Sequence, residues 1–258
     1  MATVGNIIKM TVEIIKGTKR ISAAQRIICQ RELPYKKIIL LPIPSTRDGI
    51  NVSGTDITLE SLTFGIHSGV AVCGYGLPQW FVSKLEEAGA CVYDALHDES
   101  FQQKNAELTA LGALGDIITV KSKAPSDVRF GIIGYGRIGS ALLKYLCCFG
   151  AKPIIFTRRE SVCRMLGEWG IDSTTSMRLE DYTMLDVLIN TAPAPVVDAG
   201  GALALHAAGV SMFELASGEN FGHAEQVVRL LGVPDKVFPE SAGIAYAEAI
   251  CSALLTVE

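Results

Sequence analysis

Three glycines form the most informative pattern in the chain. They belong to the run Gly134-Tyr135-Gly136-Arg137-Ile138-Gly139, which follows a predicted strand from Arg129 and leads into a helical pattern through Phe149. In such a turn the first glycine permits the bend, the second lets a phosphate approach the backbone, and the third lets the helix lie close to the sheet. The helix amino terminus then offers N–H groups and a partial positive charge to the phosphates. We therefore predict that these six residues bind the pyrophosphate of a dinucleotide; the alternative is a glycine-rich turn without a ligand.

The end of the next predicted strand, Lys152 to Phe156, indicates which dinucleotide to expect. A site for NAD usually carries Asp or Glu about 20 residues beyond the glycines, where it binds the ribose hydroxyls. This chain has Thr157-Arg158-Arg159 there, and Glu160 only afterwards. Two guanidinium groups and a hydroxyl suit the 2′-phosphate of NADP, because arginine offers a fork of donors and keeps its charge. The sequence therefore predicts NADP rather than NAD, unless both arginines are solvated loop residues.

A further segment, Leu188 to Pro195, has the pattern of a buried strand that ends in a loop. Ligands of doubly wound sheets lie beyond the carboxyl ends of the strands. We therefore expect Thr191, Ala192 and Pro193 to line the nicotinamide side of the site. A proline-rich turn without a ligand would give the same pattern.

A second glycine turn, Gly74-Tyr75-Gly76, lies in an earlier strand–turn–helix–strand pattern. Gln79 replaces its third glycine, and Pro78 removes one N–H from the turn, although proline is tolerated at a helix start. Asp94 follows where a ribose-binding acid would be expected. We interpret this turn as structural, since one good nucleotide site is enough.

No residue is identified as the catalytic acid or base. Hydride transfer needs orientation by the protein and one group that handles the hydroxyl proton. Ser45 and Arg47 follow a buried strand of the first half, and Arg47 is suited to clamp a substrate carboxylate. Glu214 is placed to face the cofactor. An ordinary polar turn and an ordinary strand-end carboxylate explain these residues equally well, none of the four histidines lies in a recognisable motif, and no metal site is expected.

Alternating strand and helix patterns along the chain predict an α/β fold with parallel sheets. We expect a smaller α/β domain at residues 1–124, whose last helix, at about 101–118, crosses between domains. The polar stretch from Ser122 to Asp127 indicates the boundary. A Rossmann-type doubly wound domain is predicted at residues 125–241. Residues 242–258 are expected to form a helix that packs back on the first domain.

Composition limits the classes of protein that the chain can belong to. Its 258 residues are 49% hydrophobic and 19% charged, as in a well-packed enzyme. With a net charge of −4 and no basic stripe, a nucleic-acid partner is not expected. The opening residues, Met1-Ala2-Thr3-Val4-Gly5-Asn6, lack a basic segment leading into an apolar core. We therefore expect no secretory signal and no membrane span, and a cytoplasmic protein with reduced cysteines.

With these motifs the chain resembles the dipicolinate synthase A family. The similarity is strongest from about Gly112 to Gly218, including Phe213-Glu214-Leu215-Ala216-Ser217, and extends back through Asn105-Ala106-Glu107-Leu108-Thr109. It implies a flavodoxin-like first domain, a Rossmann second domain similar to that of D-2-hydroxyacid dehydrogenases, and a role for Asn105 at the substrate. It also implies an NADP-linked dehydrogenase of sporulation that oxidises a dihydrodipicolinate-type compound together with a flavoprotein, the second component of that synthase.

The chain departs from the family pattern at the places where a substrate would bind. The family continues Leu-Ala-Ser with Arg-Pro-Gly-Gly, whereas Gly218-Glu219-Asn220-Phe221 follow here, and Leu111 replaces an acid of the helix after Asn105. Three hypotheses therefore stay open: an NADP-dependent oxidoreductase acting on a small carboxylated hydroxy or imino compound, a nucleotide-binding sensor or partner protein without catalysis, and an enzyme like the D-2-hydroxyacid dehydrogenases. A homo-oligomer is expected in each case.

Overall fold

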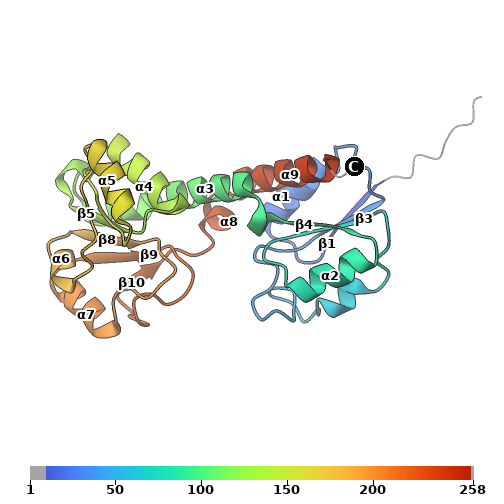
Figure 1. Cartoon of the computed structure of the whole chain (residues 1–258), viewed down its shortest axis with the longest axis horizontal. Coiled ribbons are helices and arrows are strands. Elements are labelled where there is room, and N and C mark those ends of the chain that lie inside the picture. The colour runs from blue at the N-terminus through green and yellow to red at the C-terminus, as the bar shows by residue number, and fades with distance from the viewer. Residues whose placement is uncertain (1–9, 257–258) are drawn as a thin grey trace, which may run out of the picture. The chain divides into compact units, whose positions relative to one another are not determined.

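The computed structural model describes residues 10–256, and Figure 1 shows its helices and strands. The chain divides into two compact units. The first runs to Asn105 and resumes at Pro234, and the second runs from Ala106 to Val233. The predicted domain boundaries were 124 and 241, with residues 1–9 and 257–258 of that prediction outside the described part. The boundary of the compact units falls inside a helix, α3, because its first turns pack in one core and its later turns in the other.

Within the described residues, the first unit has a parallel sheet of four strands in the order β1-β2-β3-β4. Its elements are β1 (Thr11–Ile14), α1 (Lys19–Ile28), β2 (Lys37–Leu40), η1 (Glu60–Thr63), β3 (Val70–Gly74), α2 (Gln79–Glu87), β4 (Cys91–Asp94), η2 (Ala95–His97), the start of α3 (Glu99–Thr119), most of α8 (Val233–Val237) and α9 (Pro239–Leu255).

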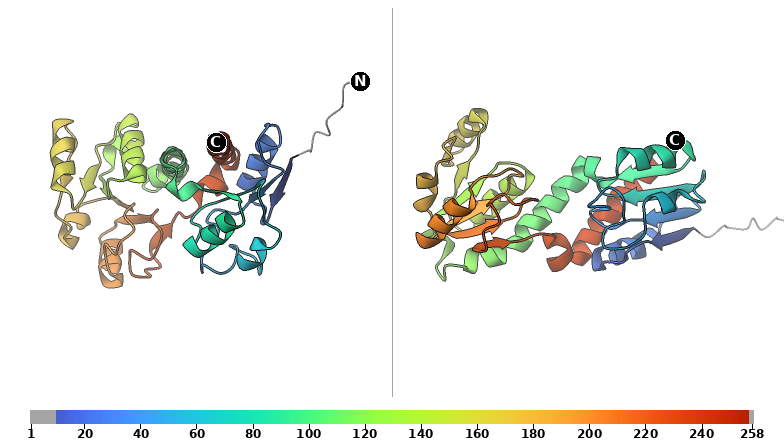
Figure 2. Two further views of the ribbon diagram at one scale, coloured as in Figure 1. Left: turned by 45° about the vertical axis from the view of Figure 1, so that its right-hand side comes forward. Right: turned by 90° about the horizontal axis from the view of Figure 1, so that it is seen from below.

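Helices cover both faces of this sheet. Strand residues alternate between faces, so Ile38 and Leu40 of β2 pack with α1 and α9, while Ile39 packs with α2. Figure 2 shows α1 and α9 side by side on one face. Thr18 caps the amino terminus of α1, because its side chain accepts a hydrogen bond from the N–H of Ile21 at 3.3 Å.

The two crossovers of the first unit have opposite hands. β1–α1–β2 and β3–α2–β4 step across the sheet in the same direction, but α1 and α2 lie on opposite faces. One of them therefore departs from the usual right-handed rule for such connections. The strand order corresponds to the flavodoxin order 2-1-3-4-5 without strand 2. In the absence of that strand, the chain passes from α1 directly to the strand on the other side of β1.

The second unit has a parallel sheet of six described strands in the order β10-β9-β8-β5-β6-β7. Read from the other edge, this is the Rossmann order 3-2-1-4-5-6, with the reversal between β5 and β8. Its elements are the rest of α3, η3 (Pro125–Asp127), β5 (Phe130–Ile133), α4 (Arg137–Cys148), β6 (Ile154–Phe156), α5 (Glu160–Glu168), β7 (Ser173–Thr174), α6 (Leu179–Thr183), β8 (Val187–Asn190), α7 (Ala199–Ala207), β9 (Ser211–Glu214) and β10 (Val227–Arg229).

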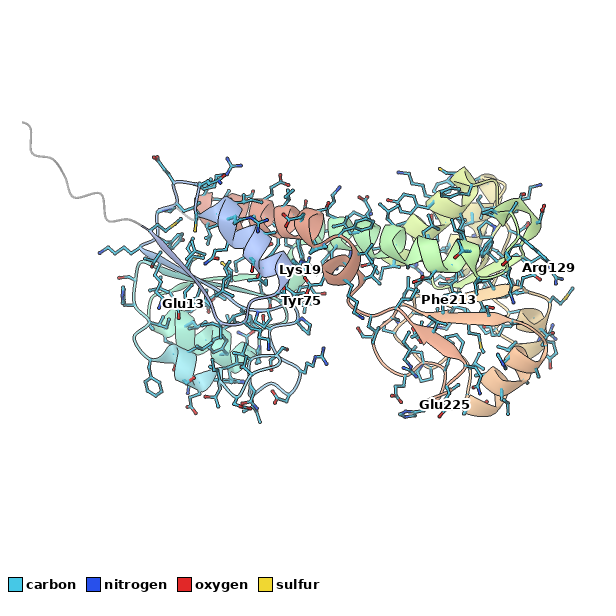
Figure 3. All side chains as sticks on the ribbon, turned by 180° about the vertical axis from the view of Figure 1, so that it is seen from behind. Glu13, Lys19, Tyr75, Arg129, Phe213 and Glu225 are labelled. Atoms are coloured by element: carbon cyan, nitrogen blue, oxygen red, sulfur yellow. The ribbon has the colours of Figure 1, made fainter. Side chains whose placement is uncertain are left out.

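Apolar strands make the core of this second unit. β5 and β8 are buried at every residue, as expected for strands covered on both faces. Phe213 of β9, labelled in Figure 3, packs with Ile132 of β5 and Ile189 of β8 on the face that α3 and α4 cover. The predicted α/β fold class, with a doubly wound parallel sheet, is confirmed. None of the helices within residues 10–256 has the combination of length and hydropathy that a bilayer span requires.

Candidate functional site

The glycine turn between β5 and α4 has the geometry that its spacing predicts. Gly134 adopts a φ of +93°, which favours glycine. A Cβ on Gly139 would lie 2.2 Å from the carbonyl oxygen of Gly134, so only glycine lets α4 approach the strand end. A Cβ on Gly136, in contrast, would meet nothing within 4 Å. No side chain caps the amino terminus of α4 at Gly136. The turn therefore leaves room for a ligand at the positive end of a helix.

The similar turn after β3 is closed by the protein itself. The carboxylate of Asp94 accepts hydrogen bonds from the N–H groups of Gly76 and Leu77, both at 2.8 Å, and from that of Leu96 at 2.9 Å. The hydroxyl of Ser45 accepts the N–H of Tyr75 at 2.7 Å. These amides are already satisfied by side chains, and this geometry agrees with a structural role for the turn.

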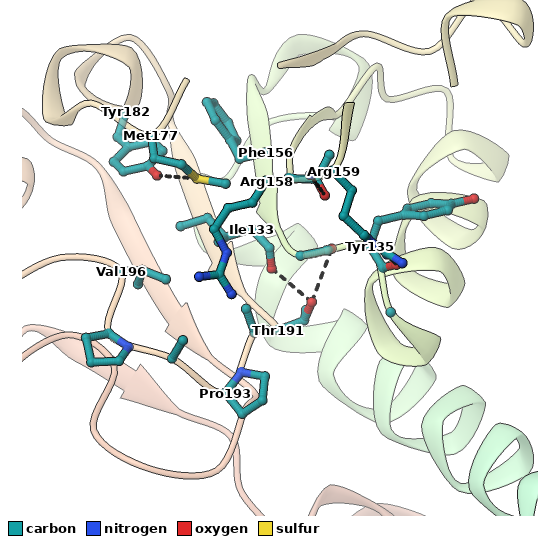
Figure 4. A pocket seen from close by; sticks show the side chains of 16 residues that line it. Ile133, Tyr135, Phe156, Arg158, Arg159, Met177, Tyr182, Thr191, Pro193 and Val196 are labelled. Carbon is teal, nitrogen blue, oxygen red and sulfur yellow. Dashed lines mark hydrogen bonds between the residues drawn. The ribbon is translucent and has the colours of Figure 1, made fainter. Parts of the chain in front are cut away.

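A cavity of about 380 Å³ opens over the glycine turn of the second unit (Figure 4). It lies beyond the carboxyl ends of the strands, at the point where the strand order reverses, as in other open α/β sheets. The lining residues are Ile133, Gly134, Tyr135, Gly136, Phe156, Thr157, Arg158, Arg159, Met177, Tyr182, Thr191, Ala192, Pro193, Ala194, Pro195 and Val196.

Most of the residues predicted for the nucleotide therefore meet at one cavity. Of the glycine run, Arg137, Ile138 and Gly139 lie in α4 and not on the cavity wall. Sequence reasoning missed the apolar wall made by Phe156, Met177 and Tyr182. Phe156 and Tyr182 pack edge to face at 5.0 Å between ring centroids. Phe156 ends β6 directly before the predicted Thr157-Arg158-Arg159 run, whereas Met177 and Tyr182 follow β7 without a recognisable motif.

The two adjacent arginines have different environments. The guanidinium of Arg159 donates to the carbonyl oxygen of Tyr135 at 2.6 Å, so it ties the end of β6 to the glycine turn. Arg158 extends into the cavity in Figure 4, and its guanidinium has no hydrogen-bond or ion-pair partner among residues 10–256. Thr157 is nearly buried, and its hydroxyl accepts the N–H of Arg159 at 3.4 Å. Arg158 is thus the cation placed to meet an anionic ligand.

Thr191 joins the loop after β8 to the glycine turn. Its hydroxyl donates to the carbonyl oxygen of Ile133 at 2.9 Å and lies 3.3 Å from that of Gly134. Asn190, fully buried beside it, donates from Nδ2 to the carbonyl oxygen of Ala192 at 2.9 Å, and its Oδ1 accepts the N–H of Ala192 at 3.0 Å. The loop is therefore held on both sides.

Glu214, which we expected to face the cofactor, is 1% exposed at the end of β9. Its carboxylate accepts from Asn190 Nδ2 at 2.9 and 3.2 Å and from the N–H of Ala216 at 2.9 Å. Burial raises the pKa of Glu214, while the hydrogen bonds from Ala216 and Asn190 and the nearby Asn220 side chain act in the opposite direction. Glu214 does not line the cavity but lies behind its wall.

The other candidate substrate residues belong to the first unit, and none of them lines this cavity. Ser45 is fully buried, and its hydroxyl donates to the carbonyl oxygen of Pro42. Arg47 is exposed in a loop that the Asp48 carboxylate organises by accepting hydrogen bonds from the residues around it. Asn105 accepts a hydrogen bond from Arg20 at 2.8 Å. Within residues 10–256, no three His, Cys, Asp or Glu side chains gather in a way that would hold a metal ion.

The strand order and the glycine turn define the class of this fold as a Rossmann-type, doubly wound architecture. Solved structures that share it include the dipicolinate synthase A protein from Bacillus halodurans, with a TM-score of 0.75 and 19% identity over 95% of this chain and 98% of that chain. The corresponding dipicolinate synthase protein from Bacillus subtilis has a TM-score of 0.76 and 15% identity over 96% of each chain. D-lactate dehydrogenase from Salmonella has a TM-score of 0.58 and 10% identity over 95% of this chain and 96% of that chain.

At these identities the likeness shows the fold. Both kinds of protein named in the sequence resemblance are among the structural neighbours, so that resemblance is confirmed at the level of fold. No family model matches the chain, and no curated protein sequence matches it.

Proposed function

We propose that this chain is an NADP-dependent oxidoreductase that acts on a small carboxylated hydroxy or imino compound, of the dihydrodipicolinate type. The observation that carries the proposal is Arg158, a guanidinium that projects without a protein partner among residues 10–256 into the cavity over an uncapped helix terminus. The named activities of the structural neighbours, a dipicolinate synthase and a dehydrogenase, support an oxidoreductase.

The residues present fit such a cofactor. The open space over Gly136 and the amino terminus of α4 suit the pyrophosphate, and Arg158 suits the 2′-phosphate. Phe156, Met177 and Tyr182 offer an apolar wall for the adenine side, and Arg159 holds the turn in place through the carbonyl oxygen of Tyr135. When bound, the nicotinamide ring supplies or accepts the hydride, and the wall from Thr191 to Val196 orients it and excludes water.

The cofactor assignment is tested by calorimetric titration of NADPH and NADH. Replacing Arg158 by alanine removes a charge-assisted contact to the 2′-phosphate, worth roughly 1.5–3 kcal/mol, and should weaken NADPH about ten- to hundredfold. NADH affinity should change little. Arg164→Ala is the matched control, because Arg164 is an exposed arginine of α5 that does not line the cavity. Equal losses for both nucleotides in Arg158→Ala would refute NADP selectivity by this residue.

A second function is favoured by one observation. Among the residues that line the cavity, none is a histidine, a lysine or a carboxylate. This favours a nucleotide-binding sensor or partner protein that does not catalyse. Following NADPH absorbance across a panel of hydroxy acids and cyclic imines separates the two: tight binding without turnover supports the sensor, and turnover supports the oxidoreductase.

The resemblance also supports proposals about the setting in which the protein works. These are a role in sporulation and a flavoprotein partner like the second component of dipicolinate synthase. A homo-oligomer in the cytoplasm stays a prediction from sequence, as does the expectation that the protein binds neither nucleic acid nor membrane.

A further inference from the structure

The carboxylate of Glu214 is buried at a place where burial is costly. A buried carboxylate is destabilising unless hydrogen bonds compensate for lost water. Here the compensating donors are the N–H of Ala216 and the side-chain amide of Asn190. An apolar residue would fill the same space without that cost, so the acid at this position calls for a reason beyond stability.

Two of the side chains around it connect to one wall of the cavity. Asn190 holds Ala192 at both backbone groups, through Nδ2 and Oδ1. Asn220, which is 4% exposed, accepts the N–H groups of Val196 and Val197 at its own carbonyl oxygen, at 2.9 and 3.3 Å. Ala192 and Val196 line the cavity. Through Asn190 the carboxylate therefore braces this wall at Ala192 from behind, while Asn220, beside the carboxylate, holds its other end at Val196.

This wall belongs to a different half of the fold from Arg158. Arg158 follows β6, on one side of the switch point between β5 and β8, whereas Glu214 and Asn190 end β9 and β8 on the other side. Each half of a Rossmann sheet accommodates one mononucleotide. In Figure 4, Pro193 and Val196 lie on the opposite side of the cavity from Tyr135 and Arg159.

We propose that Glu214 is a positioning residue: its carboxylate, acting through Asn190, shapes the cavity wall that receives the nicotinamide mononucleotide half. This inference rests on the proposed function. Glu214 then acts on the cofactor indirectly, and not by direct contact as the sequence suggested. The segment Gly218-Glu219-Asn220-Phe221, where the chain departs from the family pattern, then helps to build the wall.

The test compares NADPH with adenosine 2′,5′-bisphosphate, which represents only the adenosine half with its 2′-phosphate. Glu214→Gln keeps the side-chain length and an acceptor at the position of Oε1, but it removes the charge and turns a donor towards Asn190 Nδ2 at the position of Oε2. We expect NADPH affinity to fall about tenfold or more, the loss of a charge-assisted hydrogen bond, while affinity for the bisphosphate changes less than about twofold. Glu225→Gln is the control, because Glu225 is an exposed acid of the connection before β10 (Figure 3).

A spectroscopic measurement adds a readout that general destabilisation would not move. At saturating protein, the fluorescence of the bound reduced nicotinamide should differ between Glu214→Gln and the wild type, and be unchanged in Glu225→Gln. Equal weakening of NADPH and the bisphosphate in Glu214→Gln, or no weakening of either, would overturn the positioning role.

The outcomes also separate this inference from the proposed function. A wild-type protein that binds neither NADPH nor the bisphosphate refutes NADP binding itself, whereas one that binds both leaves Glu214→Gln to decide the inference. If Glu214→Gln does not fold, Asn190→Ala decides instead, since it removes the link between the carboxylate and the wall. It should show the same loss confined to NADPH, and an equal loss for both ligands would overturn the inference.

Discussion

At the residue scale, Gly136 and Gly139 lie in the same turn but differ in what surrounds them. A Cβ on Gly139 would lie 2.2 Å from the backbone of Gly134 and 3.0 Å from the Thr191 hydroxyl, whereas one on Gly136 would meet nothing within 4 Å. We predict that Gly136→Ala leaves the free energy of unfolding nearly unchanged but blocks the approach of a pyrophosphate, so that NADPH affinity falls at least about tenfold.

Gly139→Ala should instead destabilise the protein by about 1–3 kcal/mol, as expected for overpacking, in addition to weakening NADPH. Urea unfolding and NADPH titration of the two variants, side by side, check both statements. If Gly136→Ala binds NADPH like the wild type, the phosphate does not approach this backbone.

The sequence predicts those residues of the candidate site whose positions depend on local backbone geometry. The three glycines and the Thr157-Arg158-Arg159 run were predictable because spacing along one βαβ unit sets their positions. The burial of Ser45 and the separate roles of Arg158 and Arg159 were not predictable. Ser45 is held by the backbone of Pro42 and Tyr75, and Arg159 by the carbonyl oxygen of Tyr135. Spacing along the sequence does not show that these backbone groups lie within hydrogen-bonding distance.

At the scale of elements, the Asp186 carboxylate links the starts of two central strands. Its Oδ2 accepts from the side chain of Arg129 at 3.2 Å and from the N–H of Arg129 at 2.8 Å. These two hydrogen bonds lower the pKa of Asp186 below its usual 3.8. The stabilisation is therefore fully present above the pKa of the unfolded chain and is lost as the pH falls through the lower pKa of the folded protein.

We predict that Asp186→Ala lowers the free energy of unfolding by about 1 kcal/mol at pH 7, and that the difference from the wild type shrinks at pH 3. Urea midpoints from circular dichroism at both pH values measure this. Asp172→Ala, at an exposed acid of the same unit, is the control and should be near neutral. A deficit of the same size at both pH values would show that the carboxylate charge is not involved.

The elements that the sequence predicts are those with long apolar patterns. The crossing helix was expected at about 101–118 and is found at Glu99–Thr119, and β8 and β9 match their apolar runs closely. β1, β7 and β10, all edge strands, were not predicted. β1 has exposed and half-buried residues in alternation over four positions, and β7 has only Ser173 and Thr174. Such short edge strands are set by pairing with a neighbour rather than by their own residues.

At the scale of the whole molecule, α9 is distant in sequence from the unit in which it packs. A Cβ on Gly243 would lie 2.5 Å from the Ala23 Cβ and 2.7 Å from the carbonyl oxygen of Arg20, so α1 and α9 meet there at close range. We predict that Gly243→Ala loosens the first unit by about 1–3 kcal/mol and leaves NADPH binding unchanged. Hydrogen exchange should quicken in peptides from α1 and α9 but not in those from β5 and β8.

Gly115→Ala provides the matched control, because this glycine of α3 has nothing within 4 Å of an added Cβ. It should be neutral or stabilise by up to about 1 kcal/mol, since alanine favours a helix. Faster exchange throughout both units in Gly243→Ala would contradict the assignment of α9 to the first unit alone.

The hydrogen bonds that Asp94 accepts from the turn after β3 bear on how many nucleotides one chain binds. The strand–turn–helix motif occurs twice, which suggests two bound nucleotides per chain. In the first copy, however, the Asp94 carboxylate at the end of β4 already occupies the N–H groups of the turn, where a phosphate would otherwise bind. A repeated strand–turn–helix motif therefore does not by itself indicate two bound nucleotides per chain. One acidic side chain can occupy the backbone N–H groups that would otherwise bind a phosphate.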